Sequence, residues 1–299
     1  MSLAVALVTA RAARGLDEDL PPLEHAMRAA GVTSHVVDWD DPEVAWGSFD
    51  IALLRSTWDY TDRLAEFLAW VDRAARLTNL LNASEVVRWN TDKHYLAELA
   101  RSGAPVVPST FVEPGGSVEQ ALREFMARHD AAEFVIKPAV GAGSRDTQRH
   151  DRTKLEPAVA QAQRLLGARR SVLLQPYLDS VDRDGETALI YFSGEFSHAI
   201  RKGPLLPRGL AGSPAVGLFA PEKITPRTPG ADELRVGERV LSALPFAAPL
   251  YARIDLIRDA AGAPALLELE LTEPSLFFAH GPGAAERLAR AVLRAAAPL

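Results

Sequence analysis

The segment Phe134–Ser144 reads Phe-Val-Ile-Lys-Pro-Ala-Val-Gly-Ala-Gly-Ser and constrains the fold more than any other stretch. Its apolar half predicts a buried strand that ends at Lys137. Gly141 and Gly143 then let the backbone bend sharply and approach a ligand, and loop N–H groups beside a lysine can hold phosphate oxygens. No Gly-Lys-Ser/Thr follows and Asp146 replaces a third glycine, which excludes a P-loop and a dinucleotide fingerprint. The pattern predicts another kind of nucleoside triphosphate site, with a plain glycine turn as the alternative.

The composition narrows the class of protein. The 299 residues suffice for two or three lobes, and the net charge of −6 argues against a nucleic-acid-binding face. The chain has no cysteine, which excludes thiolate nucleophiles and cysteine zinc sites. No apolar stretch approaches the ~20 residues that span a bilayer, and the apolar start at 2–10 predicts a strand and not a signal peptide. We expect a cytoplasmic protein that binds small molecules, with no nucleic acid and no membrane as partner.

Residues 1–89 alternate strand and helix patterns, which predicts a parallel sheet covered by helices. Strands are expected at 3–8, 33–37 and 51–54, and a helix at 20–30. Ligands collect at the carboxyl ends of such strands, and the third strand runs into the substrate candidates Arg55, Ser56, Thr57, Trp58 and Asp59. Arg55 can hold a carboxylate bidentately. Alternatively, Trp58 anchors the next helix and Arg55 pairs with an acid.

A helix is expected at 92–101, with Lys93 in its first turn. A cation there opposes the helix dipole, which phosphate binding would explain, although surface lysines are common. A strand at 172–175 leads into 175–178, which predicts either a hinge against an adenine ring or a plain proline turn.

A hairpin is expected from strands at 186–192 and 195–200, and it leads into Arg201 and Lys202. The stretch 203–230 that follows is rich in proline and glycine. Its length predicts a mobile cover over a site.

A second hairpin is expected around the turn 259–262. Antiparallel pairing places Asp255 opposite Glu268. Arg253 then lies opposite Glu270, and all four side chains share one face. Three carboxylates beside one arginine destabilise a sheet unless a further cation joins them. Mg²⁺, which prefers carboxylate oxygens together with phosphates, would supply it; the alternative is a solvated outer face.

In this order, the motifs between 90 and 275 resemble those of the ATP-grasp ligases. The resemblance implies an α/β fold with a preATP-grasp parallel-sheet lobe at 1–89, a small central lobe at 90–175 and an antiparallel-sheet lobe at 176–299. ATP is expected between the last two lobes.

The resemblance also implies roles for single residues. It assigns ATP binding to Lys93, Lys137, Gly141, Gly143, Ser144, Gln175, Tyr177, Leu178 and Glu186. Asp182 is an alternative candidate for the acidic position assigned to Glu186. The resemblance assigns Mg²⁺ to Asp255, Glu268 and Glu270, and catalysis to Arg253, Arg201 and Lys202. Two departures leave the metal ligation open: Glu270 stands where asparagine is common, and Pro274 comes one residue later than usual.

Within this family, 55–60, 88–90 and 268–276 resemble the cyclo-ligases of D-cycloserine biosynthesis. The implied reaction activates the carboxylate of O-ureido-D-serine as an acyl-phosphate, which an internal nitrogen attacks to close a five-membered ring. Ser275 joins 55–59 as an implied substrate contact. Two alternatives stay open: an intermolecular carboxylate–amine ligase, and a non-catalytic ATP-binding regulatory protein. Family habit suggests a homodimer.

Overall fold

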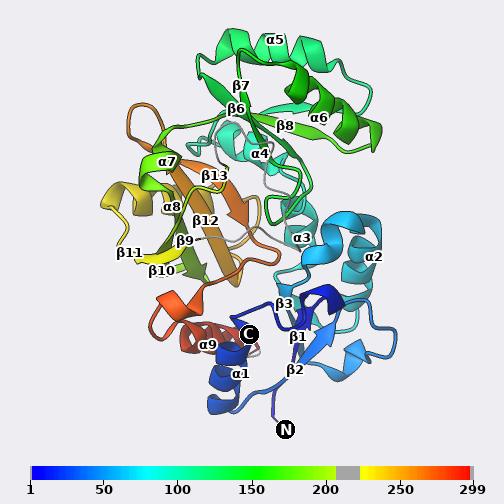
Figure 1. The fold of residues 1–299 in the computed structure, drawn as a ribbon. Coiled ribbons are helices and arrows are strands. Elements are labelled where there is room, and N and C mark those ends of the chain that lie inside the picture. The colour runs from blue at the N-terminus through cyan, green and yellow to red at the C-terminus, as the bar shows by residue number, and fades with distance from the viewer. Residues whose placement is uncertain (1, 207–222, 297–299) are drawn as a thin grey trace.

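The computed structural model describes residues 2–206 and 223–296, and these residues form three sheets (Figure 1). The first sheet is parallel, as expected. Its strands lie in the order β2–β1–β3–β4, with the bounds β1 Ala4–Thr9, β2 Thr33–Asp38, β3 Ile51–Ser56 and β4 Asn79–Leu81. Sequence analysis missed β4 because three residues are too few to show a periodic pattern.

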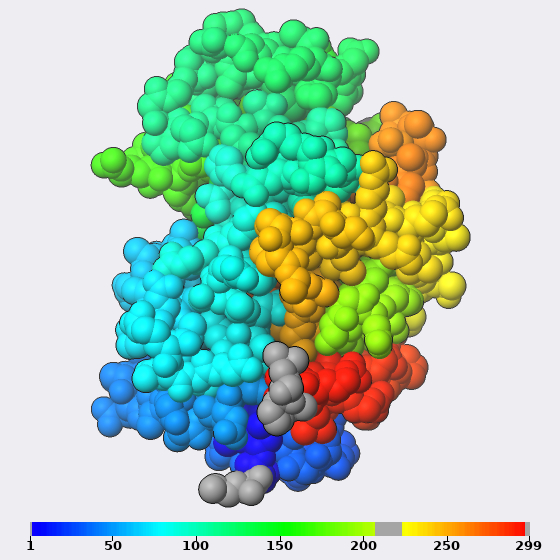
Figure 2. Space-filling model, turned by 180° about the vertical axis from the view of Figure 1, so that it is seen from behind, coloured from blue at the N-terminus to red at the C-terminus, as the bar shows by residue number. Residues whose placement is uncertain are grey.

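Helices cover both faces of the first sheet. α2 (Leu64–Ala74) packs on the face that carries Leu54. α1 (Leu20–Ala29) and the C-terminal α9 (Ala284–Ala296) pack on the opposite face, and Figure 2 shows α9 in red beside the blue N-terminal residues. Tyr251 of the third sheet belongs to the same core. Short 3-10 helices lie in the loops of this lobe: η1 Arg11–Ala13, η2 Trp46–Ser48 and η3 Trp58–Asp62.

The second sheet is antiparallel, with strands in the order β5–β8–β6–β7. Their bounds are β5 Thr110–Val112, β6 Glu133–Pro138, β7 Gln148–Asp151 and β8 Val172–Pro176. α5 (Val118–Arg128) and α6 (Glu156–Gly167) cover one face, where Phe134 and Leu174 are buried (Figure 1). β6 and β8 confirm the strands expected beside the glycine-rich loop and the hinge.

The third sheet is also antiparallel, with strands in the order β11–β10–β9–β12–β13. Their bounds are β9 Glu186–Phe192, β10 Glu195–Lys202, β11 Ile224–Arg227, β12 Tyr251–Arg258 and β13 Pro264–Glu270. Apolar side chains of α4 (Tyr95–Arg101) and α8 (Ala231–Ser242) join its core. The other helices are α3 Ser84–Asn90, α7 Ser180–Asp184 and η4 Phe278–His280. No helix in the described part of the chain is long and apolar enough to cross a membrane.

Both predicted hairpins of the third sheet are confirmed. β9 and β10 pair antiparallel around the turn at 193–194. In the β12–β13 pair, Arg253 lies opposite Glu270 and Asp255 lies opposite Glu268, as the sequence predicts. A bulge follows Asp255 and leaves this register intact.

The helix expected at 92–101 is wrong at its start. α3 ends at Asn90, α4 begins at Tyr95, and a turn joins them. The side chain of Asp92 accepts a hydrogen bond from the N–H of His94, which favours a turn. Lys93 therefore lies in a turn, and the helix-dipole argument does not apply to it.

Two further expectations concern boundaries. In the stretch expected as a mobile cover, 224–227 form β11 and pair with β10, while 207–222 lie outside the described residues. α3 and β8 run across the expected lobe boundaries after 89 and 175. The division into lobes at these positions stays a prediction.

Candidate active site

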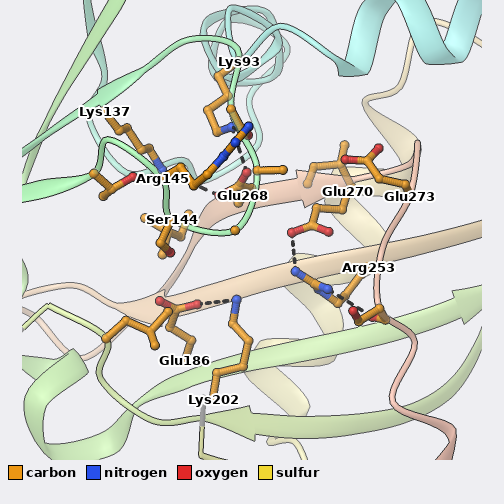
Figure 3. A pocket seen from close by; sticks show the side chains of 18 of the residues that line it. Lys93, Lys137, Ser144, Arg145, Glu186, Lys202, Arg253, Glu268, Glu270 and Glu273 are labelled. Carbon is orange, nitrogen blue, oxygen red and sulfur yellow. Dashed lines mark hydrogen bonds and ion pairs between the residues drawn. The ribbon is translucent and has the colours of Figure 1, made fainter. Parts of the chain in front are cut away.

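A cavity of about 610 Å³ lies between the three sheets, and side chains from all three lobes line it (Figure 3). Its volume is typical of a site for a small ligand. Basic and acidic side chains face each other across it, and those labelled in Figure 3 are Lys93, Lys137, Ser144, Arg145, Glu186, Lys202, Arg253, Glu268, Glu270 and Glu273. The fold thus brings together stretches that are far apart in the sequence.

Two predicted phosphate-binding lysines meet at Glu268. Lys93 Nζ lies 3.0 Å from Glu268 Oε1 and donates a hydrogen bond to Gly141 O at 2.7 Å. Lys137 Nζ lies 3.7 Å from Glu268 Oε2. Burial raises the pKa of Glu268, but the two ammonium groups outweigh it and hold the pKa at about 2. Burial lowers the pKa of Lys137.

A second charged group surrounds Asp255. Lys202 Nζ lies 2.7 Å from Asp255 Oδ2 and 2.9 Å from Glu186 Oε2. The guanidinium of Arg253 donates to both oxygens of Asp255, at 2.9 and 3.0 Å. It also pairs with Glu270. Although burial raises the pKa of Asp255, these cations lower it below its ordinary value.

Two glutamates of this site have raised pKa values. Burial raises the pKa of Glu270 to about 7, with Asp255 and Glu268 adding to the effect against the pull of Arg253. Burial and the charge of Glu270 raise the pKa of Glu273 to about 8. In the part of the cavity that holds Glu270 and Glu273, burial and neighbouring carboxylates thus disfavour the charged form of both side chains.

The donor set allows a test of the expected Mg²⁺ site. Within the described residues, no three acidic or histidine side chains are grouped closely enough to hold a metal ion. Both oxygens of Asp255 accept hydrogen bonds from Arg253 and Lys202. Glu268 and Glu270 line the cavity from β13. These two glutamates are therefore the carboxylates that a divalent cation in the cavity would meet, in exchange for their present lysine and arginine partners, whereas Asp255 does not line the cavity.

The carboxylates of the β12–β13 hairpin do not depend on a metal alone for charge balance, contrary to the expectation from the hairpin's own sequence. The structure brings Lys93 and Lys137 from the central lobe and Lys202 from β10 onto the same face. Protein cations therefore supply much of the balance.

The glycine-rich loop lines the cavity with Gly141, Gly143 and Ser144. Gly143 has φ +61°, a conformation that glycine adopts without strain. Arg145, which follows Ser144, reaches the first lobe: its Nη1 donates to Asp62 Oδ2 at 2.8 Å and its Nη2 to Thr61 Oγ1. The loop is thus tied to η3.

The predicted hinge also lines the cavity, through Gln175, Tyr177 and Leu178. The guanidinium of Arg149 stacks 3.5 Å from the centre of the Tyr177 ring. Asp182 accepts a hydrogen bond from the Tyr177 hydroxyl at 2.6 Å and does not line the cavity. Of the two acidic candidates beyond the hinge, Glu186 alone faces the cavity.

Seven predicted site residues do not line the cavity: Arg55, Ser56, Thr57, Asp59, Asp182, Arg201 and Asp255. Arg55 is fully buried; its Nη2 donates to Pro274 O at 3.3 Å and lies 3.6 Å from Asp19. This is the structural alternative that the sequence left open. Ser56 shares a hydrogen bond with the hydroxyl of Thr9.

The other displaced candidates also have structural partners. Asp59 accepts from the indole of Trp39 at 2.9 Å. Arg201 donates to the backbone carbonyls of Asp184 and Arg183. On β10, neighbouring side chains point to opposite faces, so Lys202 enters the cavity and Arg201 does not. Trp58 and Ser275 do line it.

Sequence analysis missed Asp17, Asp19, Arg145 and Glu273. Asp19 accepts hydrogen bonds from three consecutive backbone N–H groups at 276–278, at 2.6, 3.0 and 2.8 Å. The acidic run 17–19 follows the first strand, so the rule of carboxyl-end ligand sites applied to it as well.

Comparison with solved structures defines the class. The chain resembles the ATP-grasp ligase PsnB with its minimal precursor, with a TM-score of 0.65 and 18% identity over 98% of this chain and 99% of that one. It resembles a D-alanine–D-alanine ligase from Bacillus anthracis with a TM-score of 0.66 and 13% identity over 99% and 97%. The fold is that of the ATP-grasp ligases.

Nearer relatives narrow the family. The N-terminal domain family of D-cycloserine synthetase DcsG matches residues 5–82. The cycloserine biosynthesis protein DcsG of Streptomyces lavendulae is 42% identical over 96% of this chain and 97% of its own length. The crystal structure of D-cycloserine synthetase DcsG matches with a TM-score of 0.91 and 41% identity, over 98% of this chain and all of that one. The chain belongs to the D-cycloserine synthetase family, and the protein is an ATP-dependent ligase.

Proposed function

We propose that the protein uses Mg²⁺-ATP to activate the carboxylate of O-ureido-D-serine and closes the product into D-cycloserine. The observation that carries this proposal is one cavity in which Lys93, Lys137, Lys202 and Arg253 converge. Such a set of cations suits phosphoryl transfer, which needs positioning and charge compensation more than a protein nucleophile. The 42% identity to a cycloserine biosynthesis protein, over 96% of this chain, supports the choice of substrate.

The hinge and the glycine-rich loop bind the nucleotide in this proposal. Gln175, Tyr177 and Leu178 contact the adenine ring, and Glu186 lies toward the ribose. The three lysines take up phosphate oxygens, for which they exchange their present carboxylate partners. Glu268 and Glu270 would hold Mg²⁺, which would supply positive charge to offset that of the phosphates.

Arg253 orients the substrate carboxylate toward the γ-phosphate. A carboxylate oxygen attacks phosphorus, and ADP leaves. Arg253 then stabilises the oxyanion that forms when the internal nitrogen attacks the acyl-phosphate and expels phosphate. The ring of cycloserine lacks the carbamoyl group of O-ureido-D-serine, so one water is also consumed to release that group. The glycine-rich loop excludes other water, which would hydrolyse the acyl-phosphate.

The test is ADP release with Mg²⁺-ATP and O-ureido-D-serine as the sole co-substrate, with mass analysis of the product. The expected result is ADP release that depends on this substrate, together with the mass of the closed ring. Turnover only after addition of a free amine would replace the proposal with an intermolecular ligase. ATP binding without turnover under either condition would favour a regulatory protein.

A further inference from the structure

Glu273 differs from the other carboxylates that line the cavity. Apart from the exposed Glu18, each of the others lies within 4 Å of a lysine or arginine: Asp17 and Asp19 beside Arg55, Glu186 beside Lys202, Glu268 beside Lys93 and Glu270 beside Arg253. Among the described residues, Glu273 has no such partner. Its exposed fraction is only 8%. A carboxylate in this position lacks a counter-ion that a ligand can supply.

The surroundings hold Glu273 in place. Its side chain lies close to the hydroxyl of Tyr60, and its backbone carbonyl accepts a hydrogen bond from the indole of Trp58 at 3.0 Å. Both aromatic residues line the cavity and come from η3. A fixed carboxylate beside aromatic rings is a favourable environment for an organic cation.

The position of Arg253 indicates which kind of organic cation would fit beside Glu273. Figure 3 shows Arg253 and Glu273 on either side of Glu270. Arg253 also donates to the carbonyl of Ser275, in the same loop as Glu273. In an α-amino acid, the ammonium group and the carboxylate are attached to one carbon atom. When the carboxylate of a substrate lies at Arg253, its ammonium group is close to the same guanidinium, which contacts the loop that carries Glu273.

We propose that Glu273, supported by Trp58 and Tyr60, binds the α-ammonium group of the substrate and selects α-amino acids over acids that lack the amine. This inference rests on the proposed function, because it takes the substrate to be an amino acid activated at its carboxylate. It also gives a reason for chemical selectivity. An amine that is held as a cation has no free electron pair and cannot attack the acyl-phosphate, so the internal nitrogen is left to close the ring.

The experiment compares the binding of two probes by calorimetry, in the presence of Mg²⁺ and a non-hydrolysable ATP analogue. One probe is O-ureido-D-serine, and the other is the same molecule with hydrogen in place of the α-amino group. The wild type is expected to bind the first about 10- to 100-fold more tightly, as hydrogen bonds to charged groups do. In Glu273→Gln, which keeps an acceptor for Tyr60, this ratio is expected to fall close to one.

The control is Glu18→Gln, which removes a charge from an exposed glutamate of the same cavity. It is expected to keep the wild-type ratio. Equal binding of the two probes by the wild type would overturn the inference, while turnover of O-ureido-D-serine would still uphold the proposed function. An unchanged ratio in Glu273→Gln would overturn the role of Glu273. Binding of neither probe by the wild type would overturn both proposals.

Discussion

The cavity has two walls that are held in different ways. On one wall, Lys93 and Lys137 are paired with the single carboxylate of Glu268. The other wall is the loop 273–278, where backbone groups make fixed hydrogen bonds: Asp19 accepts three N–H groups, while Arg55, Trp58 and Arg253 donate to the carbonyls of 274, 273 and 275. We call these the lysine wall and the loop wall.

The difference between the two walls indicates which contacts a ligand has to rearrange when it binds. An ion pair between side chains is exchanged for an ion pair with phosphate without loss of folded structure. A backbone loop held by buried hydrogen bonds is set before any ligand arrives, and leaving one of those groups unpaired costs stability. The lysine wall is thus built to respond to the nucleotide, and the loop wall is built to hold its shape.

The largest expected effect is on activity at the lysine wall. Lys137→Met is expected to lower kcat/KM for ATP by about 1000-fold, because a group that stabilises the transferring phosphoryl oxygens is lost. The melting temperature is expected to change little. Burial lowers the pKa of this lysine, which means that its charged form is disfavoured in the folded protein, so its removal costs little stability. ADP release and thermal unfolding measure the two quantities. Lys154→Met, at an exposed position of the same lobe, is the control. Loss of stability equal to that of a core variant would show that both walls are structural.

At the loop wall, the expected effect is on stability. Asp19→Ala removes the acceptor of three backbone N–H groups, two of them buried, and is expected to lower the free energy of unfolding by about 2–3 kcal/mol. Chemical denaturation measures it, with Glu18→Ala at the exposed neighbour as the control. A variant of Asp19 with wild-type stability would mean that the loop does not depend on these bonds.

The smallest effect is a pH dependence at the loop wall. Nε2 of the buried His198 donates to Leu276 O at 2.8 Å, and burial lowers the pKa of this imidazole below its ordinary value. The unfolded chain binds a proton below pH ~6.5 while the folded protein does not yet bind it. Stability is therefore complete above that pH and falls as the pH drops, by at most about 1.4 kcal/mol per pH unit.

Melting temperatures between pH 8 and pH 5.5 test this dependence. His198→Gln keeps a donor for the carbonyl and is expected to give a flatter profile. His150, whose pKa burial also lowers, lies in the central lobe and gives a comparison away from the loop wall. An identical slope in the wild type and in His198→Gln would refute the assignment.

Short-range patterns were predictable from the sequence, and contacts between lobes were not. The register of Asp255 and Glu268 follows from the length of one turn, which lies within the hairpin itself. Strand alternation and the glycine-rich loop are local in the same sense. The pairing of Glu273 with Tyr60 joins the first and third lobes, and no local pattern carries it.

The position of Arg55 shows a second limit of prediction from sequence, which concerns the direction of side chains at the end of a strand. The end of a strand was correctly expected to lie near the ligand, but the sequence does not tell which side chain turns into the cavity. Arg55 turns toward two buried acids, and its neighbour Trp58 enters the cavity instead. Likewise, the turn between α3 and α4 includes a side-chain hydrogen bond at Asp92 and a backbone hydrogen bond from Lys93 N to Ala139 O, a residue distant in the sequence.

The packing of α9 on the first sheet has a consequence for biosynthesis. One face of the first sheet, whose strands β1–β3 lie within residues 4–56, is covered in part by residues 284–296, which are synthesised more than 200 residues later. Apolar side chains such as Leu7 and Leu53 stay without part of their final cover until α9 has been synthesised. The order of synthesis and the order of core closure differ, so the nascent chain exposes part of this apolar face until α9 is made.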